Sequence, residues 1–330
     1  MARLVAAFGT SHSPALNSPA EDFAAHALRD RQFPDHRDRT GRPATYEQLL
    51  RDAPDGIASQ TTPAVTAARV TSCKRHLSRL AEDVAAADLD VLLVVGDDQH
   101  EQYLDDNLPA FLVYCGETIR NCAFQASKGM PEYLQRAVAQ YCNPGSDREF
   151  PVSGALARHI VEHLIDSQFD IAYSNCLSRA GGEGHAFGFV HQRVLQRSSV
   201  AVVPVVVNTY YPPNQPRPQR CFGLGRALRA AVEAWPGEER VGIIASGGLS
   251  HFTIDEELDH LVLDACRDAD QASLAELPLA KLNSGNSEIR NWIVVAGAAE
   301  TLKNAWREYV PLYRSPAGTG CGMAFAAWEA

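Results

Sequence analysis

Residues 241–251 read Val-Gly-Ile-Ile-Ala-Ser-Gly-Gly-Leu-Ser-His, and this stretch decides how the rest of the chain is interpreted. The apolar run 241–246 predicts a buried strand. The two glycines that follow allow the backbone to turn tightly and to approach a ligand closely. His251 then stands at the carboxyl end of the strand, where open α/β sheets place their ligand sites. An imidazole at this place can exchange protons near neutral pH or bind a metal.

Apolar runs and helical spacings alternate along the chain, which predicts the α/β class. Strands are predicted at 4–8, 91–95, 110–114, 170–174 and 200–207, and helices at 64–87, 131–141, 153–165, 222–235, 255–276 and 287–309. The polar stretch 17–63 is expected to form short helices and loops that cover one side of the site. No linker divides the chain, so we expect a single domain with a central, mostly parallel or mixed sheet, helices on both faces, and the site at the strand ends.

Composition excludes several classes of protein. The 330 residues carry a net charge of −10 without a long basic run, which argues against a nucleic-acid partner. The eight cysteines include no Cys-x-x-Cys pair and are typical of reduced thiols in a cytoplasmic protein. No apolar run approaches the roughly 18 residues of a membrane span, and the N-terminus lacks the layout of a signal peptide. A homo-oligomer is compatible with this composition.

Four histidines share one context, a polar or glycine-containing segment soon after an apolar strand: His12, His100, His185 and His251. A single histidine in such a place is more often an ordinary surface or core residue. Four of them are more informative, because strand ends converge in an α/β fold. Glu288 follows two residues that can cap a helix, and its alternative role is a first-turn glutamate favoured by the helix dipole.

Two imidazoles and one carboxylate form the ligand set that non-heme iron(II) uses in oxygen chemistry, with positions left open for substrate and dioxygen. The remaining histidines could move protons to and from the substrate. The residues are thus compatible with an Fe(II) cofactor whose open positions can take a small aromatic diol and O2.

Five short motifs in order resemble the class III extradiol dioxygenases, the family of the protocatechuate 4,5-dioxygenase catalytic subunit. They begin at Ser11-His12-Ser13-Pro14, Gly96-Asp97-Asp98-Gln99-His100, Gly184-His185-Ala186-Phe187, Ser246-Gly247-Gly248-Leu249-Ser250-His251 and Glu288-Ile289-Arg290-Asn291-Trp292. The resemblance implies one catalytic domain over 1–330 that opens a catechol-type ring beside its hydroxyls, in aromatic compound catabolism. It also implies iron ligands at His12, in the second motif and at Glu288, with His251 as the acid–base residue and His185 positioning and protonating the substrate.

The second motif departs from the family pattern, in which Asp-His is followed four residues later by an aromatic residue. Counting back from Tyr103 places Gln99 at the ligand position and His100 one residue beyond it. Adjacent residues of an extended segment point in opposite directions, so one of the two is expected to bind. We assign His100 as the ligand because imidazole is the better donor to iron(II), with Gln99 as the alternative.

Two further expectations complete the assignment. Arg290 could bind a carboxylate of the substrate bidentately, and we assign it to substrate binding. The departure at Gln99 also leaves open a binding or regulatory protein with a degenerate site on the same fold. A metal-assisted hydrolase, which needs no oxygen, is the other alternative.

Overall fold

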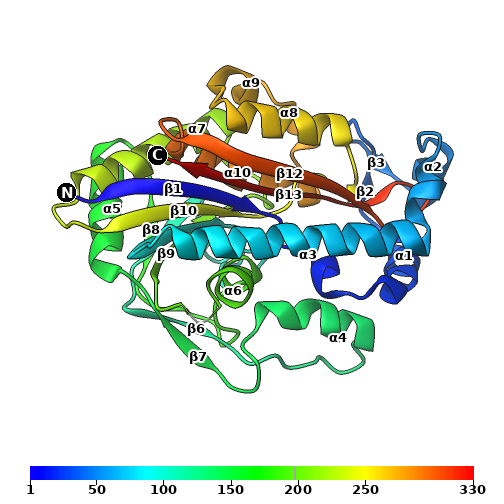
Figure 1. The fold of residues 1–330 in the computed structure, drawn as a ribbon, viewed down its shortest axis with the longest axis horizontal. Coiled ribbons are helices and arrows are strands. Elements are labelled where there is room, and N and C mark those ends of the chain that lie inside the picture. The colour runs from blue at the N-terminus through cyan, green and yellow to red at the C-terminus, as the bar shows by residue number, and fades with distance from the viewer. Residues whose placement is uncertain (197) are drawn as a thin grey trace.

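The computed structural model describes residues 1–196 and 198–330, and its centre is a nine-stranded mixed sheet (Figure 1). The strand order is β11-β13-β1-β10-β4-β9-β5-β8. The ninth strand, β12, pairs with β13 and lies outside this linear order. The strands are β1 Arg3–Thr10, β4 Val91–Gly96, β5 Phe111–Tyr114, β8 Ala172–Ser174, β9 Ala201–Val207, β10 Arg240–Ser246, β11 His251–Thr253, β12 Lys303–Tyr313 and β13 Thr319–Glu329. Two antiparallel strand pairs lie outside the sheet: the hairpin of β2 His36–Arg37 with β3 Pro43–Ala44, and β6 Thr118–Asn121 with β7 Arg148–Pro151, between which the chain forms α4.

Helices cover both faces of the sheet, as the sequence predicts. They are α1 Phe23–Gln32, α2 Tyr46–Arg51, α3 Pro63–Ala86, α4 Glu132–Val138, α5 Gly154–Asp166, α6 His185–Phe189, α7 Pro218–Ala234, α8 Glu256–Arg267, α9 Gln271–Ala275 and α10 Ile289–Ala298. Shorter 3-10 turns are η1 Pro14–Asn17, η2 Ala20–Asp22, η3 Ile57–Thr61, η4 Ala139–Tyr141, η6 Leu279–Lys281 and η7 Ser284–Glu288, and η5 Val190–Leu195 is a π-helix. The long helix α3 runs beside the sheet, while the β6–β7 pair and α4 lie at the bottom of the view (Figure 1).

Side chains of strand β4 pack into the hydrophobic cores on both faces of the sheet. Val91, Leu93 and Val95 belong to the core under α5, α7 and α10, whereas Leu92 and Val94 belong to the core under α3. Successive side chains of a strand point to opposite faces, so a strand buried on both faces reads as a continuous apolar run. The result is a single α/β domain with a hydrophobic core on each side of the sheet.

The three central strands β1, β10 and β4 are parallel and end at the same edge. In register, Thr10 pairs with Ser246 and Ala245 pairs with Val95. The segments that follow these strands therefore leave the sheet side by side, at the edge where α/β folds bind ligands.

The predicted helix 287–309 is wrong beyond Ala298. α10 ends there, and residues 303–313 form β12, which pairs along its length with β13 in an antiparallel hairpin. Tyr309, Leu312 and other aromatic or apolar residues of this segment fit a pleated surface, and the partner strand is supplied only by the folded chain. The predicted helix 255–276 is likewise divided into α8 and α9, where Ala269 adopts a left-handed φ of 50°.

The segment 17–63 forms short helices, turns and the β2–β3 hairpin, which confirms its predicted character. Phe33 of this segment packs on Phe252, the neighbour of His251, with ring centroids 4.5 Å apart. None of the described helices is long and apolar enough to cross a membrane. All eight cysteines lie in the described part of the chain, where each is a free thiol.

Helices α7 and α10 touch backbone to backbone, which fixes the helix that follows Glu288. A Cβ atom on Gly225 of α7 would lie 1.9 Å from the carbonyl oxygen of Val294. Gly225→Ala is therefore expected to destabilise the protein by about 1–3 kcal/mol, because the helices must separate. The midpoint of urea unfolding measures this change.

Gly223 on the same helix is the matched control for this prediction. A Cβ there would meet only Phe169, at an ordinary contact distance of 3.7 Å. Gly223→Ala should be neutral, or stabilising by about 0.5–1 kcal/mol, because alanine is the better helix former. Equal unfolding midpoints for the two variants would contradict the close helix contact.

Candidate metal centre

Four side chains from distant parts of the sequence meet beyond the carboxyl ends of the central strands: His12, Asp97, His185 and Glu288, together called the candidate centre. One ligand atom from each lies within 4.8 Å of all the others. Asp97 directly follows β4, and His12 is the second residue after β1. His185 is the first residue of α6, and Glu288 is the last residue of η7, just before α10. The parallel strands β1 and β4 and the starts of helices α6 and α10 thus bring the four side chains to one edge of the sheet.

The ring of His12 is held with one nitrogen free. Ser246, at the end of β10, donates its hydroxyl proton to the carbonyl oxygen of Ala186 at 2.7 Å. The same hydroxyl oxygen must therefore accept a proton from Nδ1 of His12, which is 3.0 Å away. Burial lowers the pKa of His12, which favours the neutral ring. In that tautomer the lone pair of Nε2 is available at the candidate centre.

Glu288 carries the negative charge of the candidate centre. Its carboxylate is buried and accepts a hydrogen bond from the backbone N–H of Gly248 at 2.7 Å. Burial opposes ionisation, but the charge of the nearby His251 ring holds the pKa of Glu288 below its usual range. Burial and the charge of Glu288 raise the pKa of Asp97 to about 7, so the second carboxyl group is a much weaker acid than Glu288.

The donor set fits a divalent transition metal. Nε2 of His12 and Oε2 of Glu288 are 3.3 Å apart, and in the forms described above both atoms present lone pairs to each other. Two facing lone pairs in a buried site repel unless a cation or a proton lies between them. Imidazole nitrogen and carboxylate oxygen are common ligands of iron(II) and related metals.

Of the residues predicted from the sequence, His12, His185 and Glu288 lie in the candidate centre, and His251 lies beside it. Nε2 of His251 is 3.7 Å from Oε2 of Glu288, and its Nδ1 donates to the carbonyl oxygen of Leu249 at 2.9 Å. The Gly247–Gly248 turn permits this approach, since a Cβ on Gly248 would lie 2.2 Å from the His251 ring.

His100 is not brought into the candidate centre. Its backbone has a left-handed φ of 61°, and its ring stacks on Tyr211 with centroids 3.6 Å apart and planes 3° from parallel. Gln99 points inward instead: its amide nitrogen lies 3.3 Å from Oε1 of Glu288 and 3.4 Å from Oδ2 of Asp97. Of the two alternatives in the second motif, the structure places Gln99 at the site.

Arg290 lies outside the candidate centre as well. Its buried guanidinium donates to the carbonyl oxygens of Pro216, Leu282 and Ser287, and to that of Thr209. These contacts tie the loop before α7 to the start of α10. The arginine thus braces the backbone around Glu288.

Three residues at the site were given no site role from the sequence: Asp97, Ser246 and Glu101. Asp97 and Ser246 stand at the ends of the predicted strands, so the same strand-end signal that marks His251 applies to them. Glu101 contacts His185, and no periodicity in the sequence indicates that pairing.

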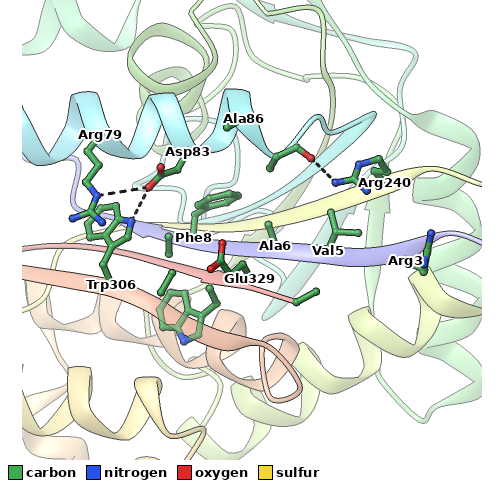
Figure 2. Close-up of a pocket in the computed structure, with 15 residues that line it drawn as sticks. Arg3, Val5, Ala6, Phe8, Arg79, Asp83, Ala86, Arg240, Trp306 and Glu329 are labelled. Atoms are coloured by element: carbon green, nitrogen blue, oxygen red, sulfur yellow. Dashed lines mark hydrogen bonds and ion pairs between the residues drawn. The ribbon is translucent and has the colours of Figure 1, made fainter.

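A cavity of about 700 Å³ lies at the opposite end of the sheet, near the start of β1 and β10 (Figure 2). There Asp83 accepts a hydrogen bond from the indole N–H of Trp306 at 2.6 Å, and Arg79 lies over the Trp306 ring at 4.2 Å. No histidine or cysteine is among the described residues that line it. This cavity therefore lacks the side chains that the metal chemistry requires.

Comparisons with known proteins match this chain to a family. The model of the family "catalytic LigB subunit of aromatic ring-opening dioxygenase" matches residues 58–323, a range that contains Gln99, His185, His251 and Glu288. Gallate dioxygenase of Pseudomonas putida is 30% identical over 193 residues, covering 53% of this chain and 54% of that protein. A 2,3-dihydroxyphenylpropionate/2,3-dihydroxicinnamic acid 1,2-dioxygenase of Comamonas testosteroni is 26% identical over 162 residues, covering 49% and 43%. The chain thus matches about half the length of each of these relatives. Because the family match spans most of the chain, this protein belongs to the family of the catalytic LigB subunit of aromatic ring-opening dioxygenases.

Proposed function

We propose that this protein is an Fe(II)-dependent extradiol dioxygenase that opens a catechol-type ring beside its hydroxyl groups, with O2 as co-substrate. The observation that carries the proposal is the 3.3 Å approach of His12 Nε2 to Glu288 Oε2 in a buried site, where the contact of Nδ1 with Ser246 leaves the lone pair on Nε2. Family membership supports the ring-opening chemistry, and both relatives are named as dioxygenases. Bound iron would supply a place where the diol and dioxygen meet.

His12 and Glu288 would hold the metal, and Gln99 would complete the set. The amide of Gln99 can turn about its last bond so that its oxygen, rather than its nitrogen, faces the cation. Its present place between Glu288 and Asp97 already brings it to the same point. A ligand set with an amide in place of an imidazole would bind iron less tightly than one with two histidines.

The proposal distinguishes the two candidates of the second motif by mutation. Gln99→Leu should weaken Fe(II) or Mn(II) binding by more than the roughly 10–100-fold that loss of a supporting group costs, because it removes the amide beside Glu288 whose oxygen would face the cation. His100→Leu should change the affinity less than about threefold, since that ring stacks on Tyr211 outside the site. Anaerobic metal titration followed by calorimetry measures both. The reverse order of effects would return the ligand role to His100.

His185 and His251 would handle the protons of the reaction. Burial lowers the pKa of His185, but the Glu101 carboxylate raises it to about 10. Burial also lowers the pKa of His251, while Cys321 and Glu288 raise it to about 10. Each ring therefore holds a proton at neutral pH and can donate it, His185 to an oxygen of the bound diol and His251 on the Glu288 side.

Space for an aromatic ring adjoins His185. A cavity of about 550 Å³ is lined by His185, Glu101 and Tyr141, with Phe124 and Val138 on its apolar side. Ligand pockets combine apolar walls with a few polar groups that orient the ligand. We place the aromatic substrate on this side of the candidate centre.

The cytoplasmic location and the homo-oligomer remain predictions from the sequence.

An oxygen electrode tests the proposed function. After anaerobic loading with Fe(II), the protein should consume O2 in the presence of catechol, protocatechuate or gallate, and a yellow ring-opened product should form. Substrate conversion without oxygen uptake would favour a metal-assisted hydrolase. No turnover together with no metal binding would favour a binding protein with a degenerate site.

A further inference from the structure

Glu101 holds His185 at two atoms. Its Oε2 lies 2.8 Å from Nδ1 of the imidazole, and its Oε1 accepts a hydrogen bond from the backbone N–H of the same residue at 2.9 Å. One carboxylate therefore fixes both the ring and the main chain of His185, which begins helix α6. A contact with the ring alone would leave the helix start free to shift.

The neighbouring glycine is shaped to this contact. A Cβ atom on Gly184 would lie 2.7 Å from Oε2 of Glu101. Glycine at this position lets the carboxylate approach the start of α6 closely, and any side chain would push it away.

Both ends of the contact are anchored independently. Asp98 accepts hydrogen bonds from the backbone N–H groups of Glu101 and Gln102, at 3.0 and 2.9 Å. The Gln102 side chain donates to the carbonyl oxygens of Arg179 and Gly182, at 3.1 and 2.6 Å. The segment after β4 is thus fastened to the loop before α6, which holds the Glu101 carboxylate in place without help from His185 itself.

We propose that Glu101 is the positioning residue of His185: its carboxylate accepts hydrogen bonds from the Nδ1–H and the backbone N–H of His185, so that Nε2 of the ring faces His12, Asp97 and Glu288. The hydrogen bond at one ring nitrogen decides the tautomer and the direction of the other. This inference rests on the proposed function, in which His185 Nε2 meets an oxygen of the diol. Nothing in the family match or the two relatives assigns a role to Glu101.

Two substitutions separate the contacts. Glu101→Ala removes both acceptors. Glu101→Gln keeps the size, but its amide offers one acceptor and one donor end and cannot accept from both N–H groups of His185. We expect kcat on the fastest catechol of the panel to fall about 10–100-fold in both variants, with Fe(II) affinity within about threefold of the parent. Asp106→Asn is the matched control, because it removes an equal charge five residues away, where Asp106 pairs with the exposed side of Arg179.

A double-mutant cycle tests whether Glu101 acts through His185. In the His185→Ala background, Glu101→Gln should change kcat less than about twofold, because there is no ring left to orient. An equal loss of kcat in both backgrounds would show that Glu101 acts in some other way and would overturn the inference.

The hydrogen bond at Nδ1 gives a readout that does not depend on turnover. In the full chain labelled with ¹⁵N-histidine, Nδ1 of His185 should carry a proton that is hydrogen-bonded to a carboxylate in the parent and in Asp106→Asn, and this signal should be absent in Glu101→Ala. The same hydrogen-bonded Nδ1 signal in Glu101→Ala would contradict the inference. If the parent turns over no catechol, the proposed function fails, while this spectrum still decides whether Glu101 sets the ring.

Discussion

Replacing Glu288 by glutamine is expected to abolish tight Fe(II) binding and, with it, oxygen uptake. Glu288 supplies the one carboxylate of the candidate centre that its surroundings keep ionised, and it faces the free nitrogen of His12 at 3.3 Å. Glutamine keeps the size but removes the charge, so a cation would lose its main electrostatic partner. Loss of a direct ligand should exceed the roughly 10–100-fold cost of losing a supporting group.

Thermal unfolding with and without metal measures this effect without any substrate. A metal at about 100 times its Kd stabilises the folded state by about 2.7 kcal/mol. The parent should show this stabilisation and Glu288→Gln should not. Glu276→Gln, at an exposed position after α9, is the control and should behave as the parent. Full iron occupancy in Glu288→Gln would remove this residue from the ligand set.

The second large effect is expected in His251→Ala, which should keep the metal and lose turnover. Nε2 of His251 lies 3.7 Å from Glu288, and its Nδ1 donates to the carbonyl oxygen of Leu249, so the ring borders the candidate centre without joining it and would act as the proposed proton donor. Removal of a general acid or base costs about 10²–10⁴-fold. A loss of that order in kcat, with Fe(II) affinity unchanged, is the expected result.

His260→Ala is the control for this variant, because His260 is an exposed histidine on α8 whose ring contacts Tyr309. It should retain parental turnover. Parental turnover in His251→Ala would exclude that residue from the reaction, and loss of metal in His251→Ala would make it a ligand.

Much of the fold could be predicted from local patterns. The runs at 91–95 and 200–207 are apolar throughout because β4 and β9 are buried on both faces, and that pattern is visible in the sequence. The C-terminal hairpin was not predicted. β12 depends on β13 for its hydrogen bonds, and a partner strand brought by the folded chain leaves no periodicity in the segment itself.

Part of the candidate centre could likewise be predicted from the sequence, and part could not. His12 and His251 follow parallel strands that end at one edge, so their meeting with Glu288 follows from the α/β class. The choice between Gln99 and His100 depends on one left-handed φ of 61° at His100, which turns that ring onto Tyr211. Alternation in an extended segment assumes a regular backbone, and it fails where a single residue leaves that conformation.

Incorporation of labelled oxygen tests the central claim most directly. The Fe(II)-loaded protein, incubated with a catechol under ¹⁸O2, should release a yellow ring-opened product whose mass carries both atoms of the labelled dioxygen. The Glu288→Gln variant should form none of it under the same conditions. A ring-opened product with oxygen from water alone, or conversion that proceeds equally well without dioxygen, would contradict the account.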